Sequence, residues 1–251
     1  MTALITGASS GIGRDMAIYL SNLGYSLVLT GRNKEKLLEL KSMLKTPVKI
    51  ITADLSKPEN AIKLYQACKN IKIDFLVNNA GIGVVGEFEK TSLKIEVDLI
   101  NINVTSLHIL TKLFLKDFVK RDSGRILNVA SSAAFFPGPL MAAYYASKNY
   151  VLNLSESLYR ELKEKGSKVK ISVLCPGPVQ TEFNIRAGVT NSFKPADSAM
   201  VAQYAIDEAL KNRFYIVPTI HMKLGVLGAG LAPDMLLSKL VYKIQKGKKP
   251  L

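Results

Sequence analysis

Residues 6–13 read Thr-Gly-Ala-Ser-Ser-Gly-Ile-Gly, and this stretch decides the fold of the 251-residue chain. It follows an apolar run that predicts a buried strand, and it opens an amphipathic segment that predicts a helix. Because glycine has no Cβ, Gly7, Gly11 and Gly13 permit a tight turn and a close approach of the backbone to a ligand. The first turn of the helix would offer free N–H groups and a positive dipole end to a pyrophosphate. The spacing G-x-x-x-G-x-G predicts a dinucleotide-binding turn, although it differs from the common G-x-G-x-x-G.

Outward from this turn, short apolar runs alternate with longer amphipathic segments. The runs expected to form strands are residues 3–6, 26–30, 48–52, 75–78, 124–129, 170–174 and 214–217. The segments expected to form helices are residues 13–23, 34–44, 58–69, 106–119, 143–165 and 196–211. Continuous hydrophobic strands between helices are typical of a parallel sheet covered on both faces. We therefore predict an α/β fold, a Rossmann-like doubly wound sheet of about seven strands, in a single domain over residues 1–251.

The composition is that of a globular protein with a large core, since 48% of the residues are hydrophobic and 22% are charged. Two cysteines, Cys68 and Cys175, are too few for a disulfide framework. The histidines His108 and His221 lack metal-ligand spacing, so we expect no metal. A strand begins at once, leaving no room for a signal peptide, and no apolar run is long enough to span a bilayer. We therefore expect a cytoplasmic protein.

The net charge is +14, and the C-terminal region is especially basic. Residues 219–251 predict a basic helical extension in which residues 236, 237, 240, 241 and 244 form one apolar stripe. The stripe favours a helix that covers the substrate pocket; loose contact with an anionic membrane is the alternative. No nucleic-acid motif accompanies the charge, so we expect no nucleic-acid partner. Residues 181–195 lack clear periodicity and are expected to form a lid loop.

The second expected strand ends in Thr30-Gly31-Arg32. Sheets that bind NAD commonly carry a carboxylate near this point for the ribose 2′-hydroxyl. No Asp or Glu lies between Asp15 and Glu35, and Arg32 instead offers a planar cation that suits a 2′-phosphate. The sequence therefore predicts that NADP(H) is preferred over NAD(H).

Tyr144 and Lys148 lie four residues apart at the start of a predicted helix, so their side chains share one face. A phenol has an ordinary pKa of about 10, and a neighbouring ammonium would bring it closer to neutrality. This pair predicts an acid–base group. Tyr145 competes for the role, but Lys148 is only three residues beyond it.

From Thr2 to Pro218, the sequence motifs and the order in which they occur resemble those of the short-chain dehydrogenase/reductase family. They are T-G-x-x-x-G-I-G (residues 6–13), N-N-A-G (78–81), Asn103-Val104, Ala130-Ser131-Ser132, Y-x-x-x-K (144–148) and Pro176-Gly177-Pro178-Val179-Gln180-Thr181. The resemblance implies a catalytic tetrad: Asn103, Ser131, Tyr144 and Lys148. Tyr144 would protonate the substrate carbonyl, and Ser131, rather than Ser132, would hydrogen-bond that oxygen. Lys148 would bind the nicotinamide ribose and lower the pKa of Tyr144.

The resemblance also implies the remaining contacts. Asn103 is chosen over Asn101 because Asn-Val-Thr resembles the family's context, and it would hold a water that links Lys148 to solvent. The implied cofactor-binding residues are Gly7, Ser9, Ser10, Gly11, Ile12, Gly13, Arg32, Asp54, Leu55, Asn79, Ala80, Gly81, Tyr144, Lys148, Pro176, Gly177, Val179 and Thr181. The helices over residues 106–119 and 143–165 resemble those that pair between subunits, so a homodimer or homotetramer is expected.

Three functions agree with these observations. The first is an NADPH-dependent oxidoreductase that reduces a ketone or aldehyde carbonyl, with small-molecule carbonyls and alcohols as its partners. The second is a catalytically silent NADP-binding sensor or scaffold on the same fold. The third is a reductase of lipid carbonyls at a membrane surface. Apolar side chains expected around the pocket favour an apolar substrate, and they are Phe135, Phe136, Leu140, Met141 and Phe183.

Overall fold

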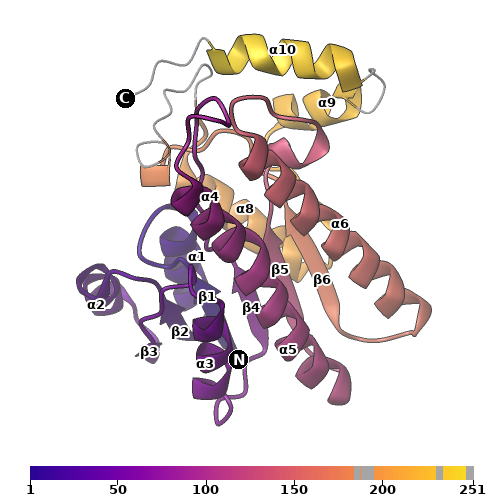
Figure 1. Cartoon of the computed structure of the whole chain (residues 1–251). Coiled ribbons are helices and arrows are strands. Elements are labelled where there is room, and N and C mark those ends of the chain that lie inside the picture. Colours follow the sequence, from indigo (N-terminus) through magenta and orange to yellow (C-terminus); the bar gives the residue numbers. More distant parts are fainter. Residues whose placement is uncertain (184–186, 188–194, 230–233, 247–251) are drawn as a thin grey trace.

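In the computed structural model, which describes residues 1–183, 187, 195–229 and 234–246, a parallel sheet forms the centre of the molecule (Figure 1). Its strands are β1 (Thr2–Thr6), β2 (Ser26–Thr30), β3 (Val48–Ile50), β4 (Phe75–Asn78), β5 (Arg125–Val129), β6 (Lys170–Leu174) and β7 (Tyr215–Ile216). In this part of the chain the order is β3-β2-β1-β4-β5-β6-β7, and every neighbouring pair is parallel. The predicted doubly wound α/β fold is confirmed.

Helices cover both faces of the sheet, because alternate side chains of each strand point to opposite sides. On one face, Ile5 and Leu29 pack against α1 (Gly11–Asn22), α2 (Lys34–Met43) and α8 (Ser198–Leu210). On the other face, Leu4 and Val28 belong to a core shared with α3 (Pro58–Ala67), α5 (Leu107–Lys120) and α6 (Ala142–Glu164). The sheet thus separates two hydrophobic cores, one on each face.

The helix expected over residues 106–119 is confirmed as α5 (Leu107–Lys120), but the sequence did not predict the helical segments that come before it. The helix expected over residues 106–119 is preceded by α4 (Leu93–Ile100) and a π-helical segment, η1 (Asn101–Ser106), which runs directly into α5. Apolar and polar residues alternate through α4, a pattern that favours a strand rather than a helix. Packing of α4 and η1 against α6 overrides that local pattern.

The expected C-terminal extension is helical in the described part. It consists of α9 (Ile220–Ala229) and α10 (Asp234–Lys246), which lie together at the end of the molecule near α4 and the start of α6 (Figure 1). Residues 230–233 and 247–251 lie outside the described residues. The predicted apolar stripe is only partly buried, because Val241 is buried whereas Leu236 and Leu240 are 63% and 55% exposed. No described helix is long and apolar enough to cross a membrane.

The two ends of the expected lid lie side by side. Gln180 N donates to the Ala196 carbonyl and Ala196 N donates to the Pro178 carbonyl, both at 2.9 Å. Residues 184–186 and 188–194 of the predicted lid lie outside the described residues. The described Phe183 packs against the ring of Tyr144, with the ring centroids 5.5 Å apart. The start of the segment therefore covers part of the site.

Candidate active site

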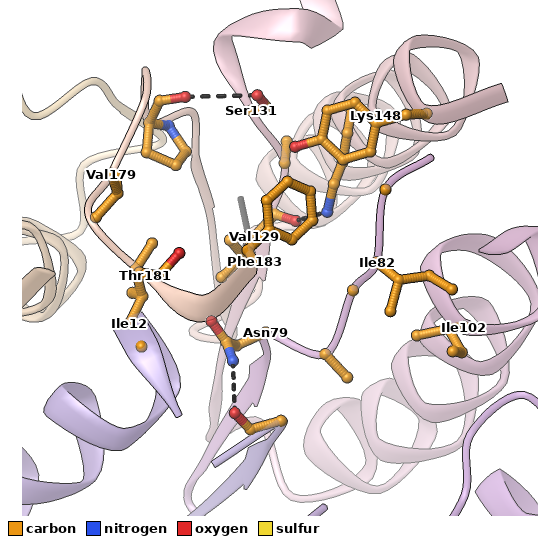
Figure 2. A pocket seen from close by; sticks show the side chains of 18 of the residues that line it. Ile12, Asn79, Ile82, Ile102, Val129, Ser131, Lys148, Val179, Thr181 and Phe183 are labelled. Atoms are coloured by element: carbon orange, nitrogen blue, oxygen red, sulfur yellow. Dashed lines mark hydrogen bonds between the residues drawn. The ribbon is translucent and has the colours of Figure 1, made fainter. Parts of the chain in front are cut away.

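A cleft of about 450 Å³ opens at the carboxyl ends of the strands. Figure 2 shows Ile12, Val179 and Thr181 on one side of it, with Ser131 and Lys148 on another. Of the residues predicted to bind cofactor, those that line it are Gly7, Ser9, Ser10, Gly11, Ile12, Arg32, Asp54, Leu55, Asn79, Ala80, Gly81, Tyr144, Lys148, Pro176, Gly177, Val179 and Thr181. The structure thus brings together side chains that the sequence places far apart.

Gly13 is not among the lining residues, and it packs behind the glycine-rich turn. A Cβ at this position would lie 2.3 Å from Asn79 Nδ2 and 2.5 Å from the Gly7 carbonyl oxygen. Asn79 Nδ2 donates to the carbonyl oxygens of Thr6 and Gly7, at 2.9 and 3.2 Å. Asn79 therefore links the glycine-rich turn after β1 to the end of β4 and fixes the conformation of the turn. Gly7 itself has a φ of +66°, which favours glycine.

The N-terminus of α1 fits a bound anion. Ser10 occupies the N-cap, yet its side chain makes no capping hydrogen bond, and the first turn of the helix carries no acidic residue. The first N–H groups of a helix have no partner within the helix. They stand at the cleft beside Ser9, Gly11 and Ile12, where a pyrophosphate would complete their hydrogen bonds.

Arg32 follows β2, and the preceding Gly31 lies beside Ser9 of the glycine-rich turn. Arg32 is exposed, it lines the cleft, and it forms no hydrogen bond or ion pair with any residue that the structure describes. A Cβ on Gly31 would lie 3.2 Å from Ser9 Oγ, so the Ser9 hydroxyl and Arg32 border the same corner. Asp54, in contrast, accepts a hydrogen bond from Ser56 N at 3.1 Å and shapes its own loop. A cation beside a hydroxyl suits a phosphate.

Ser131, Tyr144 and Lys148 gather where β5 and α6 meet. Ser131 Oγ accepts from Ala133 N at 3.1 Å and donates to the Pro176 carbonyl at 3.5 Å, and its hydroxyl lies close enough to Tyr144 to influence the pKa of the phenol. Lys148 Nζ donates to the Val129 carbonyl at 3.0 Å and lies 5.8 Å from the centroid of the Tyr144 ring. The side chains of Tyr144 and Lys148 rise from successive turns of α6, as their spacing predicted.

Burial determines the ionisation of this group. Burial raises the pKa of Tyr144 to about 12, and the neighbouring Ser131 hydroxyl has a smaller effect in the opposite direction. Burial also lowers the pKa of Lys148 to about 8. We expected Lys148 to lower the pKa of Tyr144, but the loss of solvation on burial outweighs such an effect. At neutral pH Tyr144 is therefore a protonated phenol and Lys148 remains mostly an ammonium.

Asn103 lies behind the cleft rather than on its surface. It is fully buried in η1, and its Nδ2 donates to the Ile82 carbonyl and to Ser147 Oγ, at 2.9 and 3.0 Å. Its Oδ1 accepts from Ile82 N at 2.9 Å. Because both amide hydrogens are used, its side chain holds the loop after β4 against α6. A Cβ on Gly81 would lie 3.3 Å from both Asn103 Oδ1 and Lys148 Nζ, so a larger residue would crowd both side chains.

The far end of the cleft differs from the expected substrate pocket. Met141 and Phe183 line it as predicted, but Phe135, Phe136 and Leu140 are not among its lining residues. Two residues that the sequence did not reveal take part instead. They are Tyr145, whose ring packs on Phe136, and Gln245 from α10. No local pattern could have found Gln245, because it lies 100 residues from the tyrosine that it contacts.

Comparisons with known proteins agree with this geometry. Residues 1–191 match the family model described as short chain dehydrogenase. The very-long-chain 3-oxoacyl-CoA reductase-B of Danio rerio is 32% identical over 250 residues, which cover 95% of this chain and 78% of that protein.

Solved structures show the same relationship over most of their length. A short-chain dehydrogenase from Sphingobium yanoikuyae in complex with NADPH has a TM-score of 0.82 and 29% identity, covering 94% of this chain and 95% of its own. A short chain dehydrogenase/reductase from Burkholderia phymatum in complex with NAD has a TM-score of 0.80 and 27% identity, covering 90% and 91%. The chain belongs to the short-chain dehydrogenase/reductase family of oxidoreductases.

Proposed function

We propose that this protein is an NADPH-dependent reductase that converts the carbonyl of an apolar ketone or aldehyde to an alcohol. The observation that carries the proposal is the convergence of Ser131, Tyr144 and Lys148 on one wall of the cleft. The anion-binding turn before α1 forms another wall. The Danio rerio relative supports it further, since its name describes reduction of a 3-oxo group.

The nicotinamide cofactor, when bound, supplies the hydride that adds to the carbonyl carbon. Tyr144 gives its phenolic proton to the carbonyl oxygen, so that C=O becomes CH–OH. Ser131 hydrogen-bonds the same oxygen and orients it. Lys148, as an ammonium, stabilises the phenolate that Tyr144 becomes and helps to return a proton to it. A phenol that is protonated at neutral pH is the form that reduction requires.

Asn103 acts as a positioning residue in this proposal. Its side-chain amide joins Ile82 to Ser147, and Ser147 Oγ donates in turn to the Tyr144 carbonyl at 2.7 Å. A water that links Lys148 to solvent would rely on the remaining lone pair of Oδ1 or on the main chain of η1. π-Helical turns are frequent at functional sites because they redirect backbone groups.

Arg32 supports NADPH rather than NADH as the preferred cofactor. Its guanidinium borders the corner that also contains Ser9 Oγ, where a 2′-phosphate would find a cation and a hydroxyl together. One solved relative holds NADPH and another holds NAD, so the preference rests on Arg32 and on the missing carboxylate after β2.

A second candidate is a reductase that works at a membrane surface on lipid carbonyls. Leu236 and Leu240 are exposed on α10 beside the exposed Lys239 and Lys243, and the chain carries a net charge of +14. Each lysine near an anionic membrane contributes at most about 1 kcal/mol. Binding to phosphatidylserine vesicles at physiological salt distinguishes this candidate from a purely soluble reductase.

The experiment that tests the reductase is NADPH consumption with a panel of ketones. Tyr144→Phe is expected to lower kcat by about 100-fold or more while NADPH still binds, because only the proton donor is lost. Tyr145→Phe is expected to cost much less. Tyr150→Phe, an exposed tyrosine of α6 outside the cleft, is the matched control. Binding of NADPH without turnover of any ketone would favour the silent sensor instead.

A further inference from the structure

Tyr145 and Gln245 form a polar pair inside the otherwise apolar end of the cleft. Gln245 Nε2 donates to Tyr145 Oη at 2.8 Å, and both residues line the cleft. Gln245 is only 3% exposed although it belongs to the last described helix. Its Oε1 is buried and has no hydrogen-bond partner among the described residues.

The pair has more hydrogen-bond donors than it uses. The phenol carries one polar hydrogen and the amide carries two, whereas the single contact between them uses only one. Neither side chain hydrogen-bonds any other residue that the structure describes. If the amide were turned over, Tyr145 would donate to Oε1 and the two N–H groups would then lack acceptors. In either orientation the pair keeps donors that have no acceptor among the described residues, and buried polar groups such as the Gln245 amide are normally hydrogen-bonded.

The surroundings hold the tyrosine rigidly. The Tyr145 ring lies 5.9 Å from the centroid of Phe136 and covers Gly138, where a Cβ would lie 2.1 Å from Tyr145 Cγ. The α10 helix is seated by the buried Val241 and the half-buried Ile244, which need no polar pair. A rigid, partly unsatisfied pair in a cleft is therefore suited to a ligand.

We propose that Tyr145 and Gln245 form a subsite for a second oxygen of the substrate, remote from the carbonyl that is reduced. The chemical class is a ketone that also bears a carbonyl acceptor such as an ester or thioester. This inference rests on the proposed reductase function. Tyr144 and Tyr145 are neighbours on α6 with ring centroids 6.1 Å apart, and both line the same cleft, so one bound substrate can contact both side chains.

The test compares two ketones of equal chain length, ethyl 3-oxohexanoate and 4-nonanone, which differ by the ester group. Tyr145→Phe and Gln245→Leu are each expected to lower kcat/KM for the ester about 3- to 10-fold more than for the plain ketone, the usual effect of one neutral hydrogen bond. Using the ratio of the two substrates cancels their different intrinsic reactivity. Tyr150→Phe controls for a lost hydroxyl elsewhere on α6.

The outcomes separate the subsite from the reductase function. Equal losses on both ketones, or no loss on either, would overturn the subsite and leave the pair as a seat for α10. If Gln245→Leu does not fold, Tyr145→Phe alone decides, since its ring and packing are kept. A wild type that binds NADPH but reduces neither ketone, nor any other, would overturn the reductase function and the subsite with it.

Discussion

Lys148 is a cation that the fold buries at a cost in stability. It is 4% exposed, and its Nζ has one protein partner among the described residues, the Val129 carbonyl. Burial lowers its pKa from 10.5 to about 8. Each tenfold change in an ionisation equilibrium corresponds to about 1.4 kcal/mol, so keeping Lys148 protonated in the folded protein costs about 3 kcal/mol at pH 7.

Lys148→Met is therefore expected to stabilise the cofactor-free protein while abolishing reduction. Methionine keeps the length of the side chain and removes the buried charge, but it leaves the Val129 carbonyl without its donor, a loss of about 1 kcal/mol. The net gain is about 2 kcal/mol at pH 7. For a chain of this size, that gain raises Tm by about 4–8 °C.

The lowered pKa of Lys148 also determines how the stability difference between the two proteins changes with pH. The folded protein holds the Lys148 proton less tightly than the unfolded chain, so the cost is fully present below pH 8 and fades as the pH rises towards 10.5. The advantage of Lys148→Met should therefore be constant below pH 8, shrink above it and be lost near pH 10.

Urea unfolding at a series of pH values measures the difference between the two proteins. Lys63→Met, at an exposed position of α3, is the matched control and should change stability by no more than about 0.5 kcal/mol. A Lys148→Met protein that is less stable at pH 7, or whose difference from the wild type does not change between pH 7 and pH 10, would refute the reasoning.

Three further predictions follow from other parts of the molecule. Arg32→Ala should reduce the preference for NADPH over NADH about 10- to 150-fold, measured by cofactor titration; equal affinities in the wild type would contradict the assignment. Deletion of residues 233–251 should raise KM for bulky ketones or lower Tm without abolishing NADPH binding, and only loss of salt-sensitive vesicle binding would assign that segment to a membrane. Light scattering at micromolar concentration should find a dimer or tetramer, and a monomer would count against pairing through α5 and α6.

The fold was predictable because its strands carry their own signal. Runs such as residues 26–30 and 170–174 are short and rich in apolar and β-branched residues, and the structure places each in the sheet over the same residues. The strand expected over residues 214–217 is shorter, covering Tyr215–Ile216, although the Phe214 carbonyl still accepts a hydrogen bond from Val173 N at 2.8 Å. The segment over residues 93–106 was missed because its alternation favours a strand and its helix depends on tertiary contacts.

The nearer a site residue lies to a glycine turn or a helix start, the better the sequence located it. Tyr144 and Lys148 lie on one face of α6 as their helical spacing required, and Ser131 lines the same cleft. Asn103 was expected to hold water, yet its amide hydrogens are both engaged with protein atoms. Such a partner cannot be inferred from spacing, because it depends on how the loop after β4 meets η1.

The two neighbouring tyrosines of α6, Tyr144 and Tyr145, contact different parts of the chain. Tyr144 lines the cleft together with Ser131, which follows β5. Its neighbour Tyr145 accepts a hydrogen bond from Gln245 of α10. Tyr144 and Ser131 lie within residues 1–191, which match the family model, and Gln245 lies outside them. Our proposals therefore assign the reaction chemistry to the part of the chain that matches the family model, and discrimination between substrates to the helix beyond it. Replacing α10 should therefore change the relative kcat/KM values for different ketones more than it changes the affinity for NADPH. A change in NADPH affinity as large as the change in ketone preference would contradict this separation.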